Sequence, residues 1–387
     1  MKDESKVQEP ETRKVSRRNM LKAAVVAGGA AALGFPAIVK AQGPVTMRWQ
    51  STWPQKDIFH EFALDYAKKV NDMTGGDLKI EVLPAGAVVP AFQLLEAVSK
   101  GTLDGGHGVL VYHYGKDTAL ALWGSSPAYG MDANMMLAWH KYGGGKELLN
   151  KIYQSIGANV VSFPYGPMPT QPLGWFKKPV TKADDMKGLK FRTVGISIDL
   201  FTGMGAAVNA LPGGEIVPAM DRGLLDAAEF NNASSDRLLG FPDVSKVYMQ
   251  QSYHQNAEQF EIMFNKTKFD ALPAKMKATI EYAVDAASAD MAWKAIDRYS
   301  KDYIELQTKE KVRVYKTPAS ILQKQLDIFD QVEAKKSADN LMFKEVVASQ
   351  RAFASRAVRW DLDTNVDRRM AYNHYFARKS AAPAKKS

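Results

Sequence analysis

The feature that most constrains the fold is an alternation of strand and helix patterns early in the chain. The residues predict a strand over 46–50, a helix over 58–74 and a strand over 78–83. A helix over 91–100 and a further strand after Leu103 complete the pattern. Strands that alternate with helices in this order form a largely parallel sheet with helices on its faces. The chain is therefore expected to be an α/β protein.

An internal echo of this unit predicts a second one. The segment LLEAVSKGTLD at 94–104 resembles IVPAMDRGLLD at 216–226, because both pass from a helix pattern through Lys/Arg-Gly to Leu-Asp. The echo is too irregular for a solenoid. We therefore expect two α/β lobes on one plan with a cleft between them. The elements expected in the second lobe are strands over 174–176, 189–194, 207–210 and 227–230 and a helix over 198–204.

Later segments are expected to link the two lobes. A strand over 253–264 would cross back into the first lobe and so form part of a hinge. The longest helix pattern, 274–309, has one apolar stripe, and its roughly 36 residues would span ~54 Å at the helical rise. We predict that it is a spine helix across both lobes. Helices over 319–334 and 340–360 then form a C-terminal extension.

The first 41 residues have the pattern of an export signal. The twin-arginine pattern SRRNMLK at 16–22 precedes an apolar run over 23–39 that glycine and proline interrupt. This run is shorter than the ~20 residues of a membrane-spanning helix, so a cleaved signal peptide is favoured over a membrane anchor. The chain contains no cysteine, which suits an oxidising compartment. We expect export to the bacterial periplasm and cleavage near Gln42.

The formal net charge of +9 comes mainly from the two ends of the chain. Removal of residues 1–41 lowers it to +5, and a tail over 377–387, expected to be flexible, contributes most of the remainder. The folded body is therefore close to neutral, so the basic composition gives no reason to expect a nucleic acid partner.

Catalytic motifs are scarce in this sequence. The six histidines form no i,i+4 pair and have no cysteine partners, so a zinc site is not expected. The run Gly203-Met204-Gly205 begins like a dinucleotide-binding fingerprint, but it follows a helix pattern and lacks the third glycine. We expect neither enzyme activity nor an organic cofactor. An exported enzyme is the rival interpretation, because twin-arginine export often serves cofactor-containing oxidoreductases.

A better candidate for a functional site begins at Gln171 and ends at Arg192. Arg192 lies in the apolar strand pattern 189–194, where an unpaired charge would be costly. A guanidinium donates two parallel hydrogen bonds to a carboxylate, which a lysine cannot do. Arg192 would therefore bind the carboxylate of a small ligand or form a structural ion pair, and the spacing leaves both interpretations open.

Glu229 has a similar setting in the small, apolar segment AAEF at 227–230. A bare carboxylate there needs a positive partner. A hard cation would serve, since such ions take oxygen ligands from carboxylates, amides and main-chain carbonyls. A salt bridge, with Arg192 itself as one partner, is the alternative.

Three segments carry a resemblance to a known family. They are Gly166 through Gln171 to Trp175-Phe176, the GLKFR that ends at Arg192, and the RGLLDAAEF that ends at Phe230. With them the chain, over 45–376, resembles the extracytoplasmic solute receptors of tripartite ATP-independent periplasmic (TRAP) transporters, and most of all the subgroup that binds 2-oxo acids and lactate. The resemblance implies a two-lobed periplasmic binding protein fold.

The same resemblance implies roles for individual residues. Arg192 would pair with the ligand carboxylate. A sodium or calcium ion beside the ligand would be held by Gln171, Glu229 and the main-chain oxygen of Phe230. A further ligand position falls on Gln255, where the family usually has a glutamate, which puts in doubt which cation binds and whether that position is a ligand at all.

Aromatic residues complete the implied site. Tyr112 and Tyr114 resemble the first-lobe tyrosines that close over the ligand. Trp53, Trp175 and His254 are weaker candidates for the pocket, and ordinary packing is the alternative for each of these side chains.

The resemblance thus implies a periplasmic receptor that binds a small 2-oxo or 2-hydroxy monocarboxylate with a bridging cation and delivers it to integral-membrane subunits. A dicarboxylate or a sugar acid is the alternative ligand. The segment 340–376 resembles the extension of dimeric members, so a homodimer is the hypothesis and packing on its own lobes the alternative. The expected divisions are a signal peptide over 1–41, lobe I over 44–166, lobe II over 167–252, a return to lobe I with the spine and C-terminal helices over 253–376, and the tail over 377–387.

Overall fold

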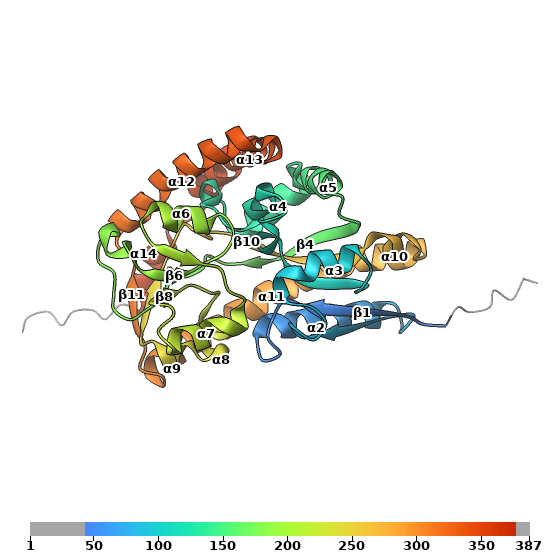
Figure 1. The fold of residues 1–387 in the computed structure, drawn as a ribbon, viewed down its shortest axis with the longest axis horizontal. Coiled ribbons are helices and arrows are strands. Elements are labelled where there is room, and N and C mark those ends of the chain that lie inside the picture. Colours follow the sequence, from blue (N-terminus) through green and yellow to red (C-terminus); the bar gives the residue numbers. More distant parts are fainter. Residues whose placement is uncertain (1–42, 377–387) are drawn as a thin grey trace, which may run out of the picture. The chain divides into compact units, whose positions relative to one another are not determined.

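The computed structural model describes residues 43–376, which contain two β-sheets with helices packed around them (Figure 1). The predicted signal peptide over 1–41 and the predicted tail over 377–387 lie outside the described residues. We call the part built on the sheet β2-β1-β3-β10-β4 lobe I and the part built on β11-β9-β5-β8-β6-β7 lobe II. The two lobes expected from the internal echo are confirmed.

The sheet of lobe I has a parallel half and an antiparallel half. Its strands are β1 (Val45–Ser51), β2 (Leu78–Leu83), β3 (Gly105–Val109), β4 (Val160–Met168) and β10 (Glu258–Asn265). The first three are mutually parallel, as the alternation of strands and helices predicts, whereas β10 runs antiparallel to both β3 and β4. Its helices are α2 (Ile58–Met73), α3 (Leu94–Ser99), α4 (Ala133–Tyr142), α5 (Gly145–Ser155) and α10 (Lys266–Asp270), with short 3₁₀ turns at Ala91–Gln93, Leu110–His113, Thr118–Trp123 and Ala128–Gly130.

Lobe II has shorter strands in a mixed sheet. They are β5 (Gly174–Phe176), β6 (Lys190–Arg192), β7 (Ala207–Asn209), β8 (Ala227–Ala228), β9 (Val247–Gln250) and β11 (Arg313–Lys316). The helices are α6 (Ser197–Gly203), α7 (Gly213–Asp221), α8 (Ala233–Leu239) and α9 (Phe241–Val244), with a 3₁₀ turn at Ala183–Met186. Because β8 lies between β5 and β6, the residues that follow it and those at the end of β6 leave the sheet at neighbouring points.

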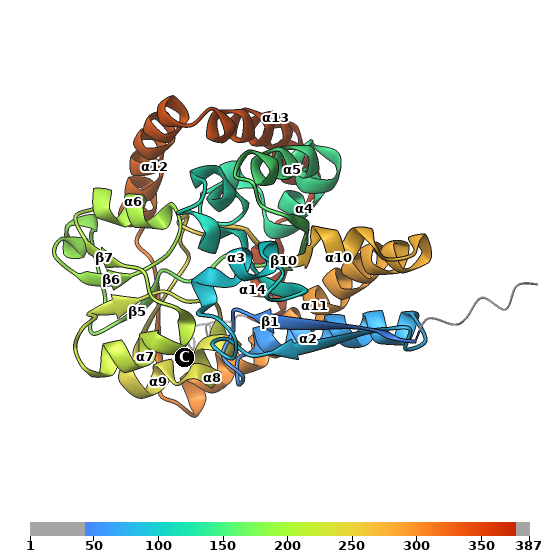
Figure 2. The same cartoon turned by 45° about the vertical axis from the view of Figure 1, so that its right-hand side comes forward.

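The spine helix predicted over 274–309 is present as α11 (Ala274–Thr308). It packs against α2 and β4 of lobe I and against α8 of lobe II, so it spans both lobes as expected. The extension consists of α12 (Ala319–Asp339), α13 (Leu341–Thr364) and α14 (Arg368–Phe376). Figures 1 and 2 show α12 beside α6 and α13 beside α4 and α5. Within residues 43–376, none of the helices has the length and apolar character needed to cross a membrane.

Several predicted boundaries were wrong. The strand expected over 253–264 begins only at Glu258, so the residues before it form a loop. The strand expected over 227–230 contains only two residues, because the chain turns away from the sheet at Glu229. No comparison tests the predicted residue limits of the lobes, and they stay a prediction.

The junction between the lobes contains two buried carboxyl groups. Asp57, at the N-terminal end of α2, accepts hydrogen bonds at Oδ1 from the amide of Phe59 (3.1 Å) and from Ser235 Oγ of α8 (2.8 Å). Among the described residues its Oδ2 has no hydrogen-bond partner. Burial raises the pKa of Asp57 and the pKa of Asp236 to about 7 each, and the charge of Asp57 further raises the pKa of Asp236. Burying these two carboxyl groups at the junction therefore costs less free energy when they are protonated.

We expect the substitution Asp57→Asn to remove part of the pH dependence of stability. The amide keeps the oxygen that accepts both hydrogen bonds but cannot ionise. Because the pKa of Asp57 rises from 3.8 to about 7 on folding, wild-type stability falls as the pH rises through this window. The variant should therefore melt at a higher temperature than wild type at pH 8, by ~2–4 °C for each kcal/mol relieved, and the difference should vanish near pH 4.

The matched control is Asp132→Asn, because Asp132 caps α4 through its side chain at an exposed position. Thermal melts from pH 4 to pH 8 compare the variants. Equal slopes for the two variants would show that Asp57 does not ionise at the junction.

Candidate functional site

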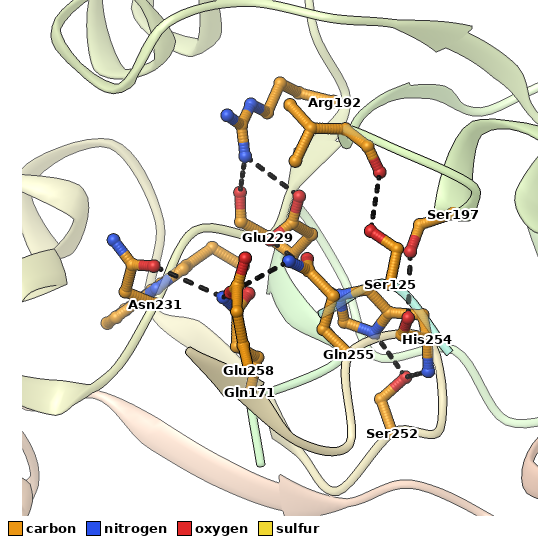
Figure 3. A network of polar contacts seen from close by, with 12 residues as sticks. Ser125, Gln171, Arg192, Ser197, Glu229, Asn231, Ser252, His254, Gln255 and Glu258 are labelled. Atoms are coloured by element: carbon orange, nitrogen blue, oxygen red, sulfur yellow. Dashed lines mark hydrogen bonds and ion pairs between the residues drawn. The ribbon is translucent and has the colours of Figure 1, made fainter. Parts of the chain in front are cut away.

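Arg192 is the last residue of β6, and its guanidinium is 1% exposed. Its Nε donates to the main-chain oxygen of Leu211 (2.9 Å). Figure 3 shows that Nη1 donates to two oxygens of Glu229, the main-chain oxygen (3.2 Å) and Oε1 (2.8 Å). Its Nη2 is buried and has no acceptor among the described residues. The guanidinium is thus fixed along one side, and one nitrogen remains available to an anion.

Glu229 follows β8 directly and is fully buried. It forms the ion pair with Arg192 that the sequence left open as an alternative. Its Oε2 has no hydrogen-bond donor in the described part of the chain, and His254 Nε2 lies 3.7 Å away from it. One oxygen of this carboxylate is therefore in an ion pair, and the other has no hydrogen-bond partner among the described residues.

A glycine in β5 permits this arrangement. A Cβ added at Gly174, whose φ is +133°, would lie 2.5 Å from the main-chain oxygen of Ala228 and 3.0 Å from the nitrogen of Glu229. Only glycine allows β5 to approach the end of β8 so closely. The backbone that precedes Glu229 is held in place by this approach.

Two amide side chains meet a second carboxylate on the other side of the site. Gln171 Nε2 donates to Glu258 Oε2 (3.0 Å) and to Asn231 Oδ1 (3.2 Å), and Gln255 Nε2 donates to the same Glu258 oxygen (3.1 Å) (Figure 3). Glu258, Gln171 and Gln255 are each 2% exposed. Burial raises the pKa of Glu258 to about 8, with a further rise from the charge of Glu229. The site therefore contains two carboxyl groups and one guanidinium, and Glu258 keeps its proton near neutral pH unless a further positive charge lies beside it.

The oxygens left over in this cluster fit a hard cation. Gln171 Oε1, Gln255 Oε1 and Glu229 Oε2 are all buried, and none has a hydrogen-bond donor among residues 43–376. Buried polar atoms without partners are costly, and carboxylate and amide oxygens are the ligands that sodium and calcium prefer. A cation among these oxygens would satisfy them and offset the negative charge. In the part of the chain that the structure describes, no group of three or more acidic, histidine or cysteine side chains is arranged to hold a metal ion, and two of the three oxygens named above belong to amides.

Most of these groups line a cavity of about 10 Å³, roughly the room that one water molecule needs, but Glu229 is not among its lining residues. It contains five of the predicted site residues, namely Gln171, Arg192, Phe230, Tyr112 and Gln255. The other residues that line it are Trp53, Val109, Val111, Val194, Asn231 and Glu258. Burial raises the pKa of the Tyr112 hydroxyl and the charge of Arg192 opposes the rise, so this hydroxyl stays a donor beside the guanidinium.

The structure separates three of the other candidates from this cavity. The hydroxyl of Tyr114 donates to Asp199 Oδ2 of α6 (2.5 Å), and Trp175 Nε1 donates to Asp236 Oδ2 (2.8 Å) behind the site. His254 is buried beside Glu229 but does not line the cavity. By contrast, Trp53 does line the cavity, although the sequence ranked it as a weaker candidate.

Sequence reasoning missed Glu258 and Asn231. Glu258 had a usable signal, because it is an acidic residue within the run AEQFEIMF, which is otherwise mostly apolar. This is the argument that singled out Glu229. Asn231 had no signal beyond its position two residues after Glu229.

Comparisons with known proteins agree with this geometry. Residues 50–339 match the DctP profile, described as bacterial extracellular solute-binding protein, family 7. A monocarboxylate 2-oxoacid-binding periplasmic protein of Nostoc sp. is 31% identical over 358 residues, which cover 90% of this chain and 96% of that relative.

Two solved structures are similar over most of the chain. One is a TRAP transporter solute-binding protein from Bordetella bronchiseptica, a mixed-occupancy dimer with copurified calcium and picolinate (TM-score 0.80, 27% identity, 86% of this chain and 97% of that chain). The other is a TRAP periplasmic solute-binding protein from Pseudoalteromonas atlantica with bound sodium and pyruvate (TM-score 0.79, 26% identity, 86% and 99%). The chain therefore belongs to family 7 of the bacterial extracellular solute-binding proteins, the DctP family, and is a solute-binding receptor of the TRAP type.

Proposed function

We propose that this receptor binds a small 2-oxo or 2-hydroxy monocarboxylate together with a sodium or calcium ion. The observation that carries the proposal is a cavity lined by Arg192, Gln171 and Gln255, in which a buried nitrogen of the arginine lacks an acceptor and a buried oxygen of each amide lacks a donor among the described residues. A third such oxygen belongs to Glu229, the ion-pair partner of Arg192. A carboxylate with a neighbouring oxo or hydroxyl oxygen, accompanied by a cation, would complement both sets.

In this proposal each side chain has a separate role. Arg192 pairs with the ligand carboxylate through Nη2, and the Tyr112 hydroxyl donates to the same end of the ligand. The cation is held by the side chains of Gln171 and Glu229, by the main-chain oxygen of Phe230 and by Gln255. Glu258 joins this set and supplies the negative charge that a glutamine at 255 lacks. The cation supplies a positive charge to which the ligand oxygens bind.

The ligands of the similar proteins support this class of ligand. The relative from Nostoc is named for monocarboxylate 2-oxoacids, and the two solved structures contain pyruvate with sodium and picolinate with calcium. In each structure the ligand is a small acid accompanied by a cation.

Calorimetric titration tests the proposal. Protein freed of small molecules by partial unfolding and refolding is titrated with pyruvate and lactate in the presence of calcium or sodium. We expect one site per chain with at least one of these acids. Failure of pyruvate, lactate and longer 2-oxo acids to bind with either ion would contradict the proposed ligand class.

A dicarboxylate or sugar acid is the second candidate ligand. It would need another cationic group, and Arg192 is the only basic side chain of the described residues that lines the site cavity. Lys116 lies at a neighbouring hollow but pairs with Glu96 at 3.5 Å. Enzyme activity finds no support among the similar proteins, which are solute-binding proteins.

We propose that Tyr114 also helps to hold the lobes together, because its hydroxyl joins the two lobes. It donates to Asp199 of α6, which also pairs with Lys336 of α12 (3.1 Å). We expect Tyr114→Phe to raise the dissociation rate of the ligand about fivefold, since a hydrogen bond to a charged group at a partly exposed position contributes about 1 kcal/mol. Stopped-flow tryptophan fluorescence measures this rate.

The matched control is Tyr129→Phe, because the Tyr129 hydroxyl also donates to a carboxylate, Glu333 (2.8 Å), but away from the cleft. Its effect on the dissociation rate should be small. If both variants release ligand at the wild-type rate, Tyr114 does not hold the lobes together.

Export and delivery complete the proposal. TRAP receptors work with integral-membrane subunits, and we propose that this one reaches the periplasm through the twin-arginine pattern at 16–22. Replacement of Arg17 and Arg18 by lysine should leave the receptor in the cytoplasm, as fractionation would detect.

We also propose that the receptor forms a homodimer through its C-terminal extension. The end of the extension exposes many large apolar side chains, and the similar protein from Bordetella is a dimer. These side chains are Trp360, Leu362, Val366, Met370, Tyr372, Tyr375 and Phe376. Light scattering at micromolar concentration should give twice the chain mass, and Trp360→Glu should reduce it. Tyr142→Glu, at a lone exposed aromatic residue, is the control, and a monomeric wild type would exclude the dimer.

A further inference from the structure

The loop over 251–257 joins β9 to β10 and carries Gln255, a proposed ligand of the cation. It begins at Gln251 with a φ of +73°, in the left-handed region that side chains rarely adopt. Ser252, His254 and Gln255 are each at most 2% exposed. Main-chain groups in a buried loop lack contact with bulk water, so the conformation of this loop depends on hydrogen bonds from the elements around it.

One of these elements is α12 of the C-terminal extension. Its buried side chains lie at the spacing of one helix face and are Ile321, Gln325, Ile328 and Phe329. Gln325 is the polar member of this set, and it is fully buried. A buried amide is costly unless it is hydrogen-bonded, so the partners of Gln325 show what holds it there.

Both ends of the Gln325 amide bind the loop. Its Oε1 accepts a hydrogen bond from the main-chain nitrogen of Tyr253 (2.9 Å), and its Nε2 donates to Ser252 Oγ (2.8 Å). Because a main-chain nitrogen can only donate, the first contact fixes which end of the amide is the oxygen. Gln325 therefore holds two successive residues of the loop in one orientation.

Two further contacts hold the loop. The hydroxyl of Ser197 in α6 donates to the main-chain oxygen of His254 (2.9 Å), as Figure 3 shows. The main-chain nitrogen of Gln171 donates to the main-chain oxygen of Gln255 (3.1 Å). The backbones of the two amide residues proposed to bind the cation are thus tied to each other, and the position of the loop sets the distance between them.

The contact with Ser252 continues toward Glu229. Ser252 Oγ lies 2.6 Å from Nδ1 of His254, and Nε2 of the same ring lies 3.7 Å from Glu229 Oε2. The ring is fully buried, and the serine that holds it is held in turn by Gln325. The ring of His254 therefore has a fixed place beside the carboxylate oxygen that is proposed to bind the cation.

We propose that Gln325 is a positioning residue of the cation site, so that α12 of the extension supports this site without lining its cavity. It acts through the loop on the position of Gln255 Oε1, and through Ser252 and His254 on the surroundings of Glu229 Oε2. The inference rests on the proposed function, because it needs a cation among these oxygens. It adds a determinant of cation affinity that lies outside the cavity.

Titration of metal-free protein with calcium, in the absence of an organic acid, tests this role. Gln325→Met keeps an unbranched side chain of similar length but removes both hydrogen bonds to the loop. We expect the calcium affinity to fall about tenfold or more, as is usual when a side chain that orients a metal ligand is lost. Wild-type affinity in a folded Gln325→Met protein would overturn the inference. A wild-type protein that binds neither calcium nor sodium would instead contradict the proposed function.

The matched control is Gln350→Met. Gln350 is also a fully buried glutamine of the extension, but its Nε2 donates to the main-chain oxygen of Leu122 (3.0 Å), and it does not line the cavity. Both variants should melt at a lower temperature than wild type, since each leaves a buried main-chain group without its partner. Only Gln325→Met should lose calcium affinity, and equal losses of affinity in the two variants would overturn the positioning role.

Ser252→Ala gives a second test if Gln325→Met does not fold. It removes the hydroxyl between Gln325 and His254 but leaves the contact between Gln325 and the main chain of Tyr253. The calcium affinity should fall about fivefold, which corresponds to one lost hydrogen bond. Wild-type affinity in this variant would overturn the inference.

The control for this second test is Ser245→Ala. Ser245 is another buried serine, and its hydroxyl donates to the main-chain oxygen of Phe176 (2.7 Å), but it does not line the cavity. Its substitution should leave the calcium affinity unchanged. A loss as large as that of Ser252→Ala would show a general effect of buried serines and would overturn the specific role of the loop.

Discussion

Replacement of Arg192 by lysine should lower the affinity for the acid by at least about 30-fold. The guanidinium is held by Leu211 and Glu229 with one nitrogen left for the ligand, and a lysine ammonium cannot make both sets of contacts. Loss of one partner from a buried, charged hydrogen-bonded pair costs about 2–5 kcal/mol, which corresponds to a loss of affinity of about 30-fold or more. Calorimetry with the tightest-binding acid, at saturating calcium, measures the loss.

The control for this substitution is Arg237→Lys. Arg237 is another arginine of lobe II in ion pairs, with Asp302 (2.9 Å), Glu305 (2.6 Å) and Glu310 (3.3 Å), but it is partly exposed and does not line the cavity. Its substitution should leave ligand affinity unchanged. Circular dichroism would verify that the Arg192 variant is folded, and a folded variant with wild-type affinity would remove the carboxylate assignment.

Removal of the cation should have a comparably large effect. Without it, the Glu229 carboxylate and the carboxyl group of Glu258 meet the incoming carboxylate with only Arg192 to offset them, and like charges a few ångströms apart repel by several kcal/mol in a buried site. We expect affinity to fall about 100-fold or more in chelator-treated, sodium-free buffer and to return on addition of calcium or sodium. Affinity that does not depend on either ion would contradict the bridging cation.

The affinity of the Glu258→Gln variant for calcium tests whether the cation lies beside Glu258. The amide keeps an oxygen for Gln171 or Gln255 but loses the charge, so calcium should bind more weakly in the absence of ligand, as direct titration of the metal shows. Glu261→Gln is the control, because Glu261 is a fully buried carboxylate of the same strand that faces His113, Tyr153 and Ser162 instead of the cavity. A similar loss in both variants would point to a general effect on β10.

The sequence was sufficient for the fold and for much of the candidate site. The alternation of patterns predicted the two lobes, and the apolar stripe of 274–309 predicted the spine helix, because both depend on periodic burial. Arg192 and Glu229 were identifiable because each is a charge in an apolar strand pattern. Their ion pair required the structure, because it depends on β6 lying beside β8.

Glu258 escaped prediction because of local backbone geometry. Residues 255 and 258 would face opposite sides of a continuous strand, since side chains alternate along it. The family resemblance placed the further ligand at Gln255, and a strand that begins at 253 would turn Glu258 to the opposite face. In the structure the chain is a loop before Glu258, so both side chains reach the cavity.

The two tyrosines illustrate the same limit. A spacing of two residues would place Tyr112 and Tyr114 on one side of an extended chain. The segment Leu110–His113 is instead a 3₁₀ turn, in which residues two apart diverge. Tyr112 therefore lies at the cavity, and Tyr114 reaches across to α6.

The ion pair between Arg192 and Glu229 has a consequence for selectivity. A guanidinium already neutralised within its own lobe has little surplus charge to offer a stray anion. In our proposal the cation has to draw on the Glu229 carboxylate before a ligand can use the guanidinium fully. Acetate has no oxo or hydroxyl oxygen beside its carboxylate and cannot chelate the cation. We therefore expect the receptor to bind acetate weakly and to select acids that chelate the cation.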